Sequence, residues 1–123
     1  MKPSQPDPSQ TNAILDLLVL GMYADGHLAM VEDERLHDFL KRQGIATEDE
    51  RRQNIGEAVT RVEHTTGDDT ARRRQLAELA ARLDAPAARS LALSTLERLL
   101  CVDEKYPPGE EHFWSEVRKA FNC

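Results

Sequence analysis

Cysteine is scarce in this chain of 123 residues, and basic residues are fewer than acidic ones. The two cysteines, Cys101 and Cys123, form neither a CxxC pair nor a disulfide framework, which favours a reducing compartment, and we expect a cytoplasmic protein. The 16 Lys and Arg residues are outnumbered by 22 Asp and Glu residues, for a formal net charge of -6. Nucleic acid and anionic lipid attract clusters of Lys and Arg, so we expect neither as a partner.

Long apolar runs and aromatic residues are also lacking. The longest apolar stretch, residues 13–24, contains Asp16 and Gly21 and is shorter than the ~18 residues of a membrane-spanning helix, so we expect no membrane insertion. Hydrophobic residues make up 40% of the chain and aromatic residues only 5%, which favours aliphatic packing of helices. The Pro- and Ser-rich start lacks the features of a secretory signal, and we predict a disordered tail over residues 1–10 and one domain over residues 11–123.

Hydrophobic spacing and capping residues predict an all-α fold of six or seven helices, because no convincing strand pattern occurs. We expect the first helix to begin after Pro8, with Ser9 or Thr11 as its cap. The signals that bound the later helices are a C-terminal glycine, a capping box, a polar segment that ends one helix and caps the next, and two helix-starting prolines. They lie at Gly44, Thr47 to Glu50, residues 65–69, Pro86 and Pro108.

Two of the expected helices are strongly apolar. The first carries apolar side chains between Ile14 and Met22 on nearly every face, and the fifth carries leucines from Leu91 to Leu100. A helix that is apolar all round must be enclosed by other helices. We therefore predict that these two helices pack against each other at the centre of the fold.

The two halves of the chain resemble each other when the sequence is shifted by 78 residues. The shift superimposes Leu18 on Leu96, Asp25 on Asp103 and Glu32 on Glu110. Each half then consists of a buried helix, an acidic turn and an amphipathic helix. We interpret the halves as a diverged internal pseudo-repeat.

The acidic turns also resemble a known family. Residues 24–28 (Ala-Asp-Gly-His-Leu) followed by Glu32 resemble the A-D-G-x-[IL]-x-x-x-E signature of the tellurite-resistance TerB-like domain. Residues 102–106 with Glu110 are similar to the degenerate second copy of that signature, and the resemblance extends over about residues 11–121. It implies a compact, non-enzymatic, all-helical bacterial domain that is associated with tellurite resistance and general stress response and is proposed to bind metal ions through acidic residues.

The first acidic turn matches the second half of an EF-hand loop, with Asp25 at its fifth position and Glu32 at its twelfth. Residues without ligand oxygens stand at the first and third positions, which excludes a high-affinity calcium loop. If the two turns converge, hard carboxylate ligands favour Ca²⁺, Mg²⁺ or Mn²⁺. Without a metal, Asp25 closes a turn and Glu32 compensates a helix N-terminus, and this alternative stays open. The candidate metal ligands are Asp25, Glu32, Asp103 and Glu110.

No catalytic signature stands out, so we expect no enzyme. The four histidines lack zinc-binding spacing and are expected at the surface, and no nucleophile elbow or phosphate-binding glycine loop occurs. Arg51, Arg52 and residues 72–74 form the one basic cluster, which we predict to be a solvated face, because consecutive residues spread around a helix. The alternative function is a protein-interaction module without metal, in which the acidic surface and the face of Arg51 and Arg72 dock a partner.

Overall fold

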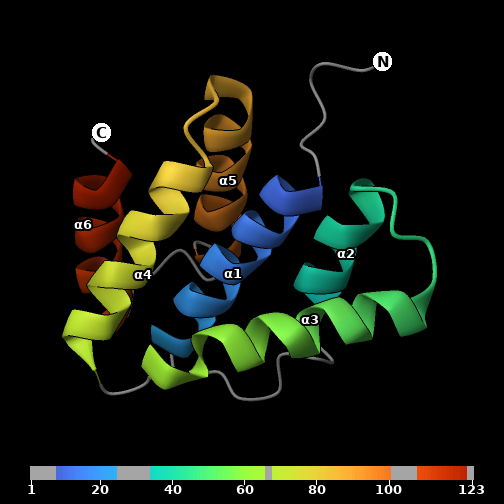
Figure 1. The fold of residues 1–123 in the computed structure, drawn as a ribbon, viewed down its shortest axis with the longest axis horizontal. Coiled ribbons are helices and arrows are strands. Elements are labelled where there is room, and N and C mark those ends of the chain that lie inside the picture. Colours follow the sequence, from blue (N-terminus) through green and yellow to red (C-terminus); the bar gives the residue numbers. More distant parts are fainter. Residues whose placement is uncertain (1–7, 25–33, 66–67, 101–107, 122–123) are drawn as a thin grey trace.

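The computed structural model describes residues 8–24, 34–65, 68–100 and 108–121, and it describes the side chains of these ranges except at 8–9, 23–24, 69, 99–100 and 108–114. Six α-helices and no strand occur in these ranges, so the predicted all-α fold is confirmed (Figure 1). The helices are α1 (Pro8–Ala24), α2 (Glu34–Arg42), α3 (Glu48–Val62), α4 (Asp69–Arg82), α5 (Pro86–Leu100) and α6 (Pro108–Phe121), and a 3-10 turn, η2 (Glu63–Thr65), follows α3.

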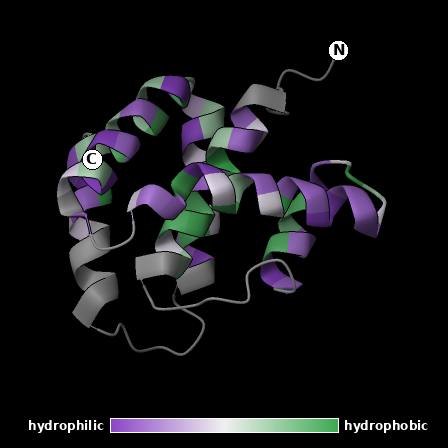
Figure 2. Cartoon of the chain, turned by 60° about the horizontal axis from the view of Figure 1, so that its bottom comes forward, coloured by the Kyte–Doolittle hydropathy of each residue, from purple (hydrophilic) through white to green (hydrophobic). Residues whose placement is uncertain are grey.

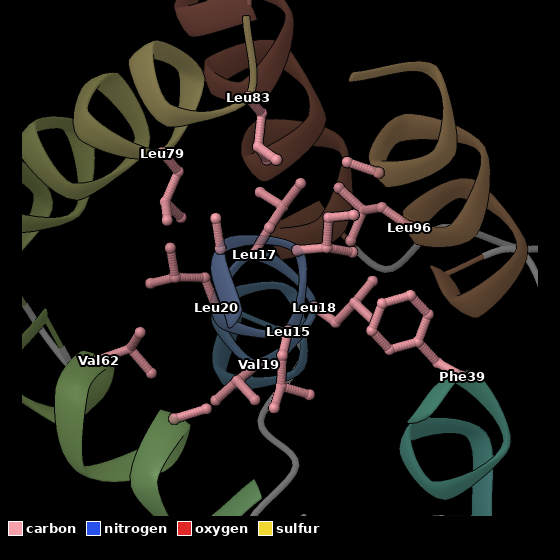
Figure 3. Close-up of a cluster of buried hydrophobic side chains, with 14 of the residues drawn as sticks. Leu15, Leu17, Leu18, Val19, Leu20, Phe39, Val62, Leu79, Leu83 and Leu96 are labelled. Atoms are coloured by element: carbon pink, nitrogen blue, oxygen red, sulfur yellow. The ribbon is translucent and has the colours of Figure 1, made fainter. Parts of the chain in front are cut away.

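Helix α1 is the centre of the fold. It packs against α3, α4, α5 and α6, and every residue from 13 to 20 is fully buried. Figure 3 looks along α1 and shows Leu17, Leu18 and Leu20 pointing outward in different directions toward the surrounding elements. The side chains that meet them include Phe39, Val62, Leu79, Leu83 and Leu96. The prediction that this helix is enclosed on all sides is confirmed.

Helix α5 packs against α1 as predicted, but other helices do not enclose it. One face is buried, whereas Leu91 and Leu93 are only half-buried and a second face is exposed. The buried face consists of Ala88, Ala92 and Leu96, and the exposed face includes Ser90, Ser94 and Glu97. The prediction of two central helices is therefore wrong for α5, because polar residues recur at helical spacing along one of its sides.

The directions of the helices agree with the pseudo-repeat. In Figure 1, α1 and α5 both run from the top of the view downward, and α2 and α6 both run upward. Pro8 and Pro86, which the shift of 78 residues superimposes, are the first residues of α1 and α5. Leu18 and Leu96 are both fully buried. The chain thus contains two pairs of consecutive helices, α1–α2 and α5–α6, that run in the same directions.

The other helices are amphipathic and turn their apolar stripes toward α1. Their buried residues recur at the spacing that the sequence predicts. They are Leu36, Phe39 and Leu40 of α2; Ile55, Ala58 and Val62 of α3; Leu76, Leu79 and Ala80 of α4; and Val117 and Phe121 of α6. Figure 2 shows the hydrophobic residues gathered in the interior and hydrophilic residues along the outer helices. None of the helices in the described ranges is long and apolar enough to cross a lipid bilayer.

The helix ends follow most of the predicted signals. Gly44 has a φ of +92°, the N–H of Ile45 donates to the Leu40 carbonyl at 3.0 Å, and the N–H of Gly44 donates to the Lys41 carbonyl at 3.0 Å. This is a Schellman motif, which ends α2 and places glycine at its left-handed position. The Thr47 hydroxyl accepts from the Glu50 N–H at 3.3 Å and caps α3.

The starts of α4 and α1 differ in how well they follow the sequence signals. The Asp68 carboxylate accepts from the Ala71 N–H at 3.0 Å and caps α4, so the cap lies within the predicted segment 65–69. Helix α1, however, already begins at Pro8, so Ser9 and Thr11 lie inside the helix and the prediction that either is the cap is wrong. Proline suits this first position, because its ring fixes a helical φ and the missing N–H would have no helical acceptor there. Residues 8–10, predicted as part of a tail, belong to α1.

Candidate functional site

The side chains of the four predicted metal ligands lie outside the described part of the structure. Asp25, Glu32 and Asp103 fall in the ranges 25–33 and 101–107, and Glu110 belongs to α6 without a described side chain. The described residues contain no group of three or more His, Cys, Asp or Glu side chains that could hold a metal ion. What the structure does describe are the helices that precede and follow each acidic turn.

A fully buried carboxylate lies in the middle of α1. Asp16 accepts three hydrogen bonds from Arg61 of α3, two from Nε at 3.0 Å and one from Nη2 to Oδ1 at 2.7 Å. The Asp16 side chain is fully buried, whereas 38% of the Arg61 side chain is exposed. A carboxylate inside an apolar core needs such a partner, because an unpaired buried charge is strongly destabilising. The pair therefore joins α1 to α3.

The ionisation of Asp16 reflects two opposing effects. Burial raises its pKa above the ordinary value, and the hydrogen bond and positive charge of Arg61 lower it again in part, with a smaller contribution from Arg82. The hydrogen bond to Asp16 raises the pKa of Arg61. Arg61 therefore remains a cation and holds the Asp16 carboxylate in place.

Two more arginines join helices in the second half of the chain. Arg72 of α4 donates from Nε to Glu116 Oε1 of α6 at 2.7 Å and from Nη2 to Oε2 at 3.1 Å. Arg89 of α5 donates to the carbonyls of Ala80, Leu83 and Phe121 at 2.8, 3.0 and 3.0 Å. These carbonyls lie at the ends of α4 and α6, where the helix itself provides no donor. Arg89 thus fastens three helices at one end of the domain.

Arg51 of α3 is buried as well, with only 6% of the residue exposed. Its Nη1 donates to the carbonyls of Ile45 and Ala46 at 3.1 and 2.6 Å, and its Nε donates to Nδ1 of His37 at 3.2 Å. Arg51 and Arg72 were predicted to lie on a solvated face. That prediction is wrong for both, because the backbone carbonyls and His37 hold Arg51 and Glu116 holds Arg72.

A charged cavity of about 590 Å³ lies between α2 and α3, and we call it the α2–α3 cavity. Glu34, Arg35, His37, Asp38 and Lys41 of α2 line one side, and Glu48, Arg51 and Arg52 of α3 line the other. Four of these side chains are basic and three are acidic, in a chain whose formal net charge is -6. Positive charge is therefore concentrated here relative to the chain as a whole.

A smaller groove of about 180 Å³ lies between α2 and α5, and we call it the α2–α5 groove. Its apolar residues are Phe39, which is buried, and Leu91, which is half-buried. Its charged residues are Arg35, Asp38, Arg42 and Arg98, and Gln43 and Thr95 complete the lining. Arg42 and Asp38 form an exposed ion pair at 3.6 Å. The groove therefore combines an apolar floor with an excess of guanidinium groups.

The other residues considered for chemistry have ordinary surroundings where the structure describes them. His64 is exposed in η2, whereas His37 is half-buried and accepts from Arg51. Ser90, Ser94 and Ser115 are exposed, and the Ser94 hydroxyl donates to the Leu91 carbonyl of its own helix at 3.3 Å. The two other histidines and both cysteines lie outside the described side chains.

The buried arginines carry a sequence signal that basic clustering conceals. Arg51 stands four residues before Ile55 and extends the inward stripe of α3 by one turn. Arg72 stands in the same way four residues before Leu76 of α4. The register of each stripe thus identifies the more buried arginine, whereas the neighbours Arg52 and Arg73 are more exposed.

Comparisons of the chain with known protein families, with characterised proteins and with solved structures give no match. Functional inference therefore depends on the residues of this chain and on their arrangement.

Proposed function

We propose that this chain is a non-enzymatic, cytoplasmic TerB-like module of the bacterial stress response, associated with tellurite resistance, that binds a divalent cation weakly through its two acidic turns. The observation that carries this proposal is that α1 and α5 pack against each other and run in the same general direction (Figure 1). In the sequence, each of the two helices is followed by one acidic turn. Packed helices that run in the same direction favour convergence of the segments that follow them.

The ligand chemistry favours a hard cation. Asp25, Glu32, Asp103 and Glu110 offer only carboxylate oxygens, which suit Ca²⁺, Mg²⁺ or Mn²⁺. Four carboxylates brought together also repel one another, and a divalent cation relieves that repulsion. Because the first half of each EF-hand-like loop lacks ligands, we expect a dissociation constant of about 10⁻⁴–10⁻³ M.

Calorimetric titration of chelator-treated protein with the three cations tests this function. We expect saturable heat for at least one cation, and we expect Glu32→Gln and Glu110→Gln each to weaken binding while the thermal unfolding transition is retained. Glu78→Gln is the matched control, because Glu78 is an exposed residue of α4 and its replacement changes the net charge equally. Only heats of dilution with all three cations at millimolar concentration would contradict the proposal.

A protein-interaction module is the second candidate, and the α2–α5 groove favours it. The face of Arg51 and Arg72 is not available for docking, because both side chains are largely buried. The groove instead pairs the apolar Phe39 and Leu91 with guanidinium groups from both helices. This combination suits an acidic amphipathic helix of a partner protein, whose apolar side chains would enter the groove while its carboxylates meet the arginines.

Fluorescence anisotropy with a labelled acidic amphipathic peptide tests the second candidate. We expect Arg98→Gln to weaken binding because it removes a guanidinium from the groove. Arg74→Gln, an exposed residue of α4 outside the groove, is the control with the same change of charge. Equal affinity of the two variants would exclude the groove as the docking surface.

A further inference from the structure

Arg51 is a buried cation that has no carboxylate partner within the described residues. Its three hydrogen bonds go to two backbone carbonyls and to the unprotonated Nδ1 of His37. No carboxylate in the described ranges forms an ion pair with it, and its Nη2 donates to no group there. Buried charges in folded proteins are normally paired with an opposite charge, so this guanidinium calls for an anion.

Among the other arginines that join helices, Arg61 and Arg72 meet buried carboxylates, whereas Arg89, which is less buried than Arg51, donates to three backbone carbonyls. Arg61 is paired with Asp16, and Arg72 is paired with Glu116, each through a bidentate contact. Arg51 is at least as buried as either of them, with 6% of the residue exposed. In place of a carboxylate, it has the α2–α3 cavity beside it.

The α2–α3 cavity suits a small polar ligand. Its volume of about 590 Å³ lies within the range of roughly 300–1,000 Å³ that small-molecule sites occupy. All of its lining side chains are charged or polar, so a lipid or other apolar ligand is a poor match. Arg35, Lys41 and Arg52 contribute positive charge together with Arg51.

The acidic residues of the same cavity restrict the size of the anion. Glu34, Asp38 and Glu48 are exposed and belong to the lining, whereas Arg51 is its buried member. The exposed carboxylates repel a long polyanion that extends over them, which favours a small oxyanion at the buried guanidinium. The planar guanidinium group binds carboxylate and phosphate oxygens in pairs.

We propose that the α2–α3 cavity binds a small ligand through a carboxylate or phosphate group that contacts Arg51 and Arg52. The ligand supplies the negative charge that Arg51 lacks among the described residues, and the ligand oxygens accept from Nη2 of Arg51. This site is built from residues other than the four candidate metal ligands and binds ligands of the opposite charge. Its occupancy therefore neither requires nor excludes a cation at those turns.

A ¹H–¹⁵N NMR titration that observes backbone amides and arginine Nε–H groups tests the site. Inorganic phosphate and succinate serve as probes of the two oxyanion sources, and sodium chloride at equal ionic strength serves as the reference. We expect saturable shifts within residues 34–52 and at the Arg51 Nε–H with at least one probe. Whichever probe saturates at the lower concentration identifies the preferred oxyanion.

Two variants separate the cavity from general charge effects. Arg52 is only half-buried, so Arg52→Gln should fold, and we expect it to weaken binding about tenfold through the loss of one charge-assisted contact. Arg74→Gln removes the same charge from an exposed position of α4 and should bind like the unmodified protein. Shifts no larger than those with sodium chloride, or equal affinities of the two variants, would overturn the proposal.

Discussion

Helices α1 and α5 occupy equivalent places in the two halves of the chain, yet their surroundings differ. Every residue of α1 from 13 to 20 is fully buried, whereas α5 buries Ala88, Ala92 and Leu96 and exposes Ser94 and Glu97. A single small domain has room for one enclosed helix. The repeated order of helices therefore preserves helix direction and contact, but it does not preserve burial.

The difference extends to individual positions. The shift of 78 residues superimposes Asp16 of α1 on Ser94 of α5. Asp16 is fully buried and paired with Arg61, whereas Ser94 is exposed and bonds only to the Leu91 carbonyl of its own helix. Polar residues at equivalent positions thus have a tertiary role in one copy and a local role in the other.

The largest expected difference between the two helices is at their aligned leucines. Leu18→Ala should lower the free energy of unfolding by about 4 kcal/mol and Leu96→Ala by about 2–3 kcal/mol. Both side chains are fully buried, but the peripheral α5 can move toward the vacated space, whereas α1 is held by neighbours on all sides. Urea denaturation of both variants measures the difference. A larger loss of stability for Leu96→Ala than for Leu18→Ala would contradict the claim that α1 is the more tightly enclosed helix.

The next effect tests the buried ion pair that distinguishes α1. Arg61→Gln should destabilise the fold by about 3 kcal/mol at neutral pH, the lower end of the range for broken buried pairs, because part of Arg61 is already solvated. The double variant Asp16→Leu/Arg61→Met should recover most of this loss, since it leaves no unpaired charge. If Arg61→Gln and the double variant unfold at the same denaturant concentration, the unpaired carboxylate is not the cause.

The stability loss of the same variant should depend on pH in a definite direction. Burial raises the pKa of Asp16 in the folded protein above its ordinary value of 3.8, so protonation of Asp16 stabilises the fold. This stabilisation is complete at a pH below the ordinary pKa and is lost as the pH rises through the raised pKa. Without Arg61 the pKa rises further, because the main lowering contribution is removed. The stability gap between Arg61→Gln and the unmodified protein should therefore narrow as the pH falls from 7 toward 4. A gap that widens on acidification would contradict this assignment.

A smaller loss of stability is expected at Gly44, which is exposed to solvent. Gly44→Ala at the end of α2 should cost about 1 kcal/mol, because a side chain disfavours its φ of +92°. A Cβ atom there would meet no other atom within 4 Å, so the cost comes from the backbone alone. Thermal unfolding measures it, and an unchanged midpoint would show that the Schellman motif contributes nothing.

The smallest effect is expected at the exposed counterpart of Asp16. Ser94→Ala should change stability by less than about 0.5 kcal/mol, because Ser94 is exposed and its hydroxyl donates to a carbonyl of its own helix. Asp16→Ala, which leaves Arg61 without its partner and opens a space in the core, provides the contrast in the same denaturation experiment. Comparable losses of stability for Asp16→Ala and Ser94→Ala would contradict the distinction between a tertiary role for Asp16 and a local role for Ser94.

Much of the fold could be predicted from local sequence signals. Gly44, Thr47 and Asp68 act on backbone groups within a few residues, and their roles follow from residue type and spacing. The enclosure of α1 also follows from its own apolar composition. The exposure of α5 does not, because it depends on which helices the chain later packs against that face.

The candidate sites were harder to predict because they depend on contacts between distant residues. The partners of Asp16 and Arg72 stand 45 and 44 residues away, and no local pattern joins them. The clustering of basic residues predicts a solvated Arg51, whereas the register of Arg51 with Ile55 agrees with its buried position. The four candidate metal ligands remain predictions from the sequence pattern.

A backbone NMR titration of chelator-treated protein with Ca²⁺ and Mg²⁺ tests the proposed function most directly, because it observes both acidic turns separately. We predict that amide signals of residues 25–33 and 103–110 move together and report one dissociation constant of about 10⁻⁴–10⁻³ M. Movement of only one turn, or of neither turn at millimolar cation, would contradict a shared cation site.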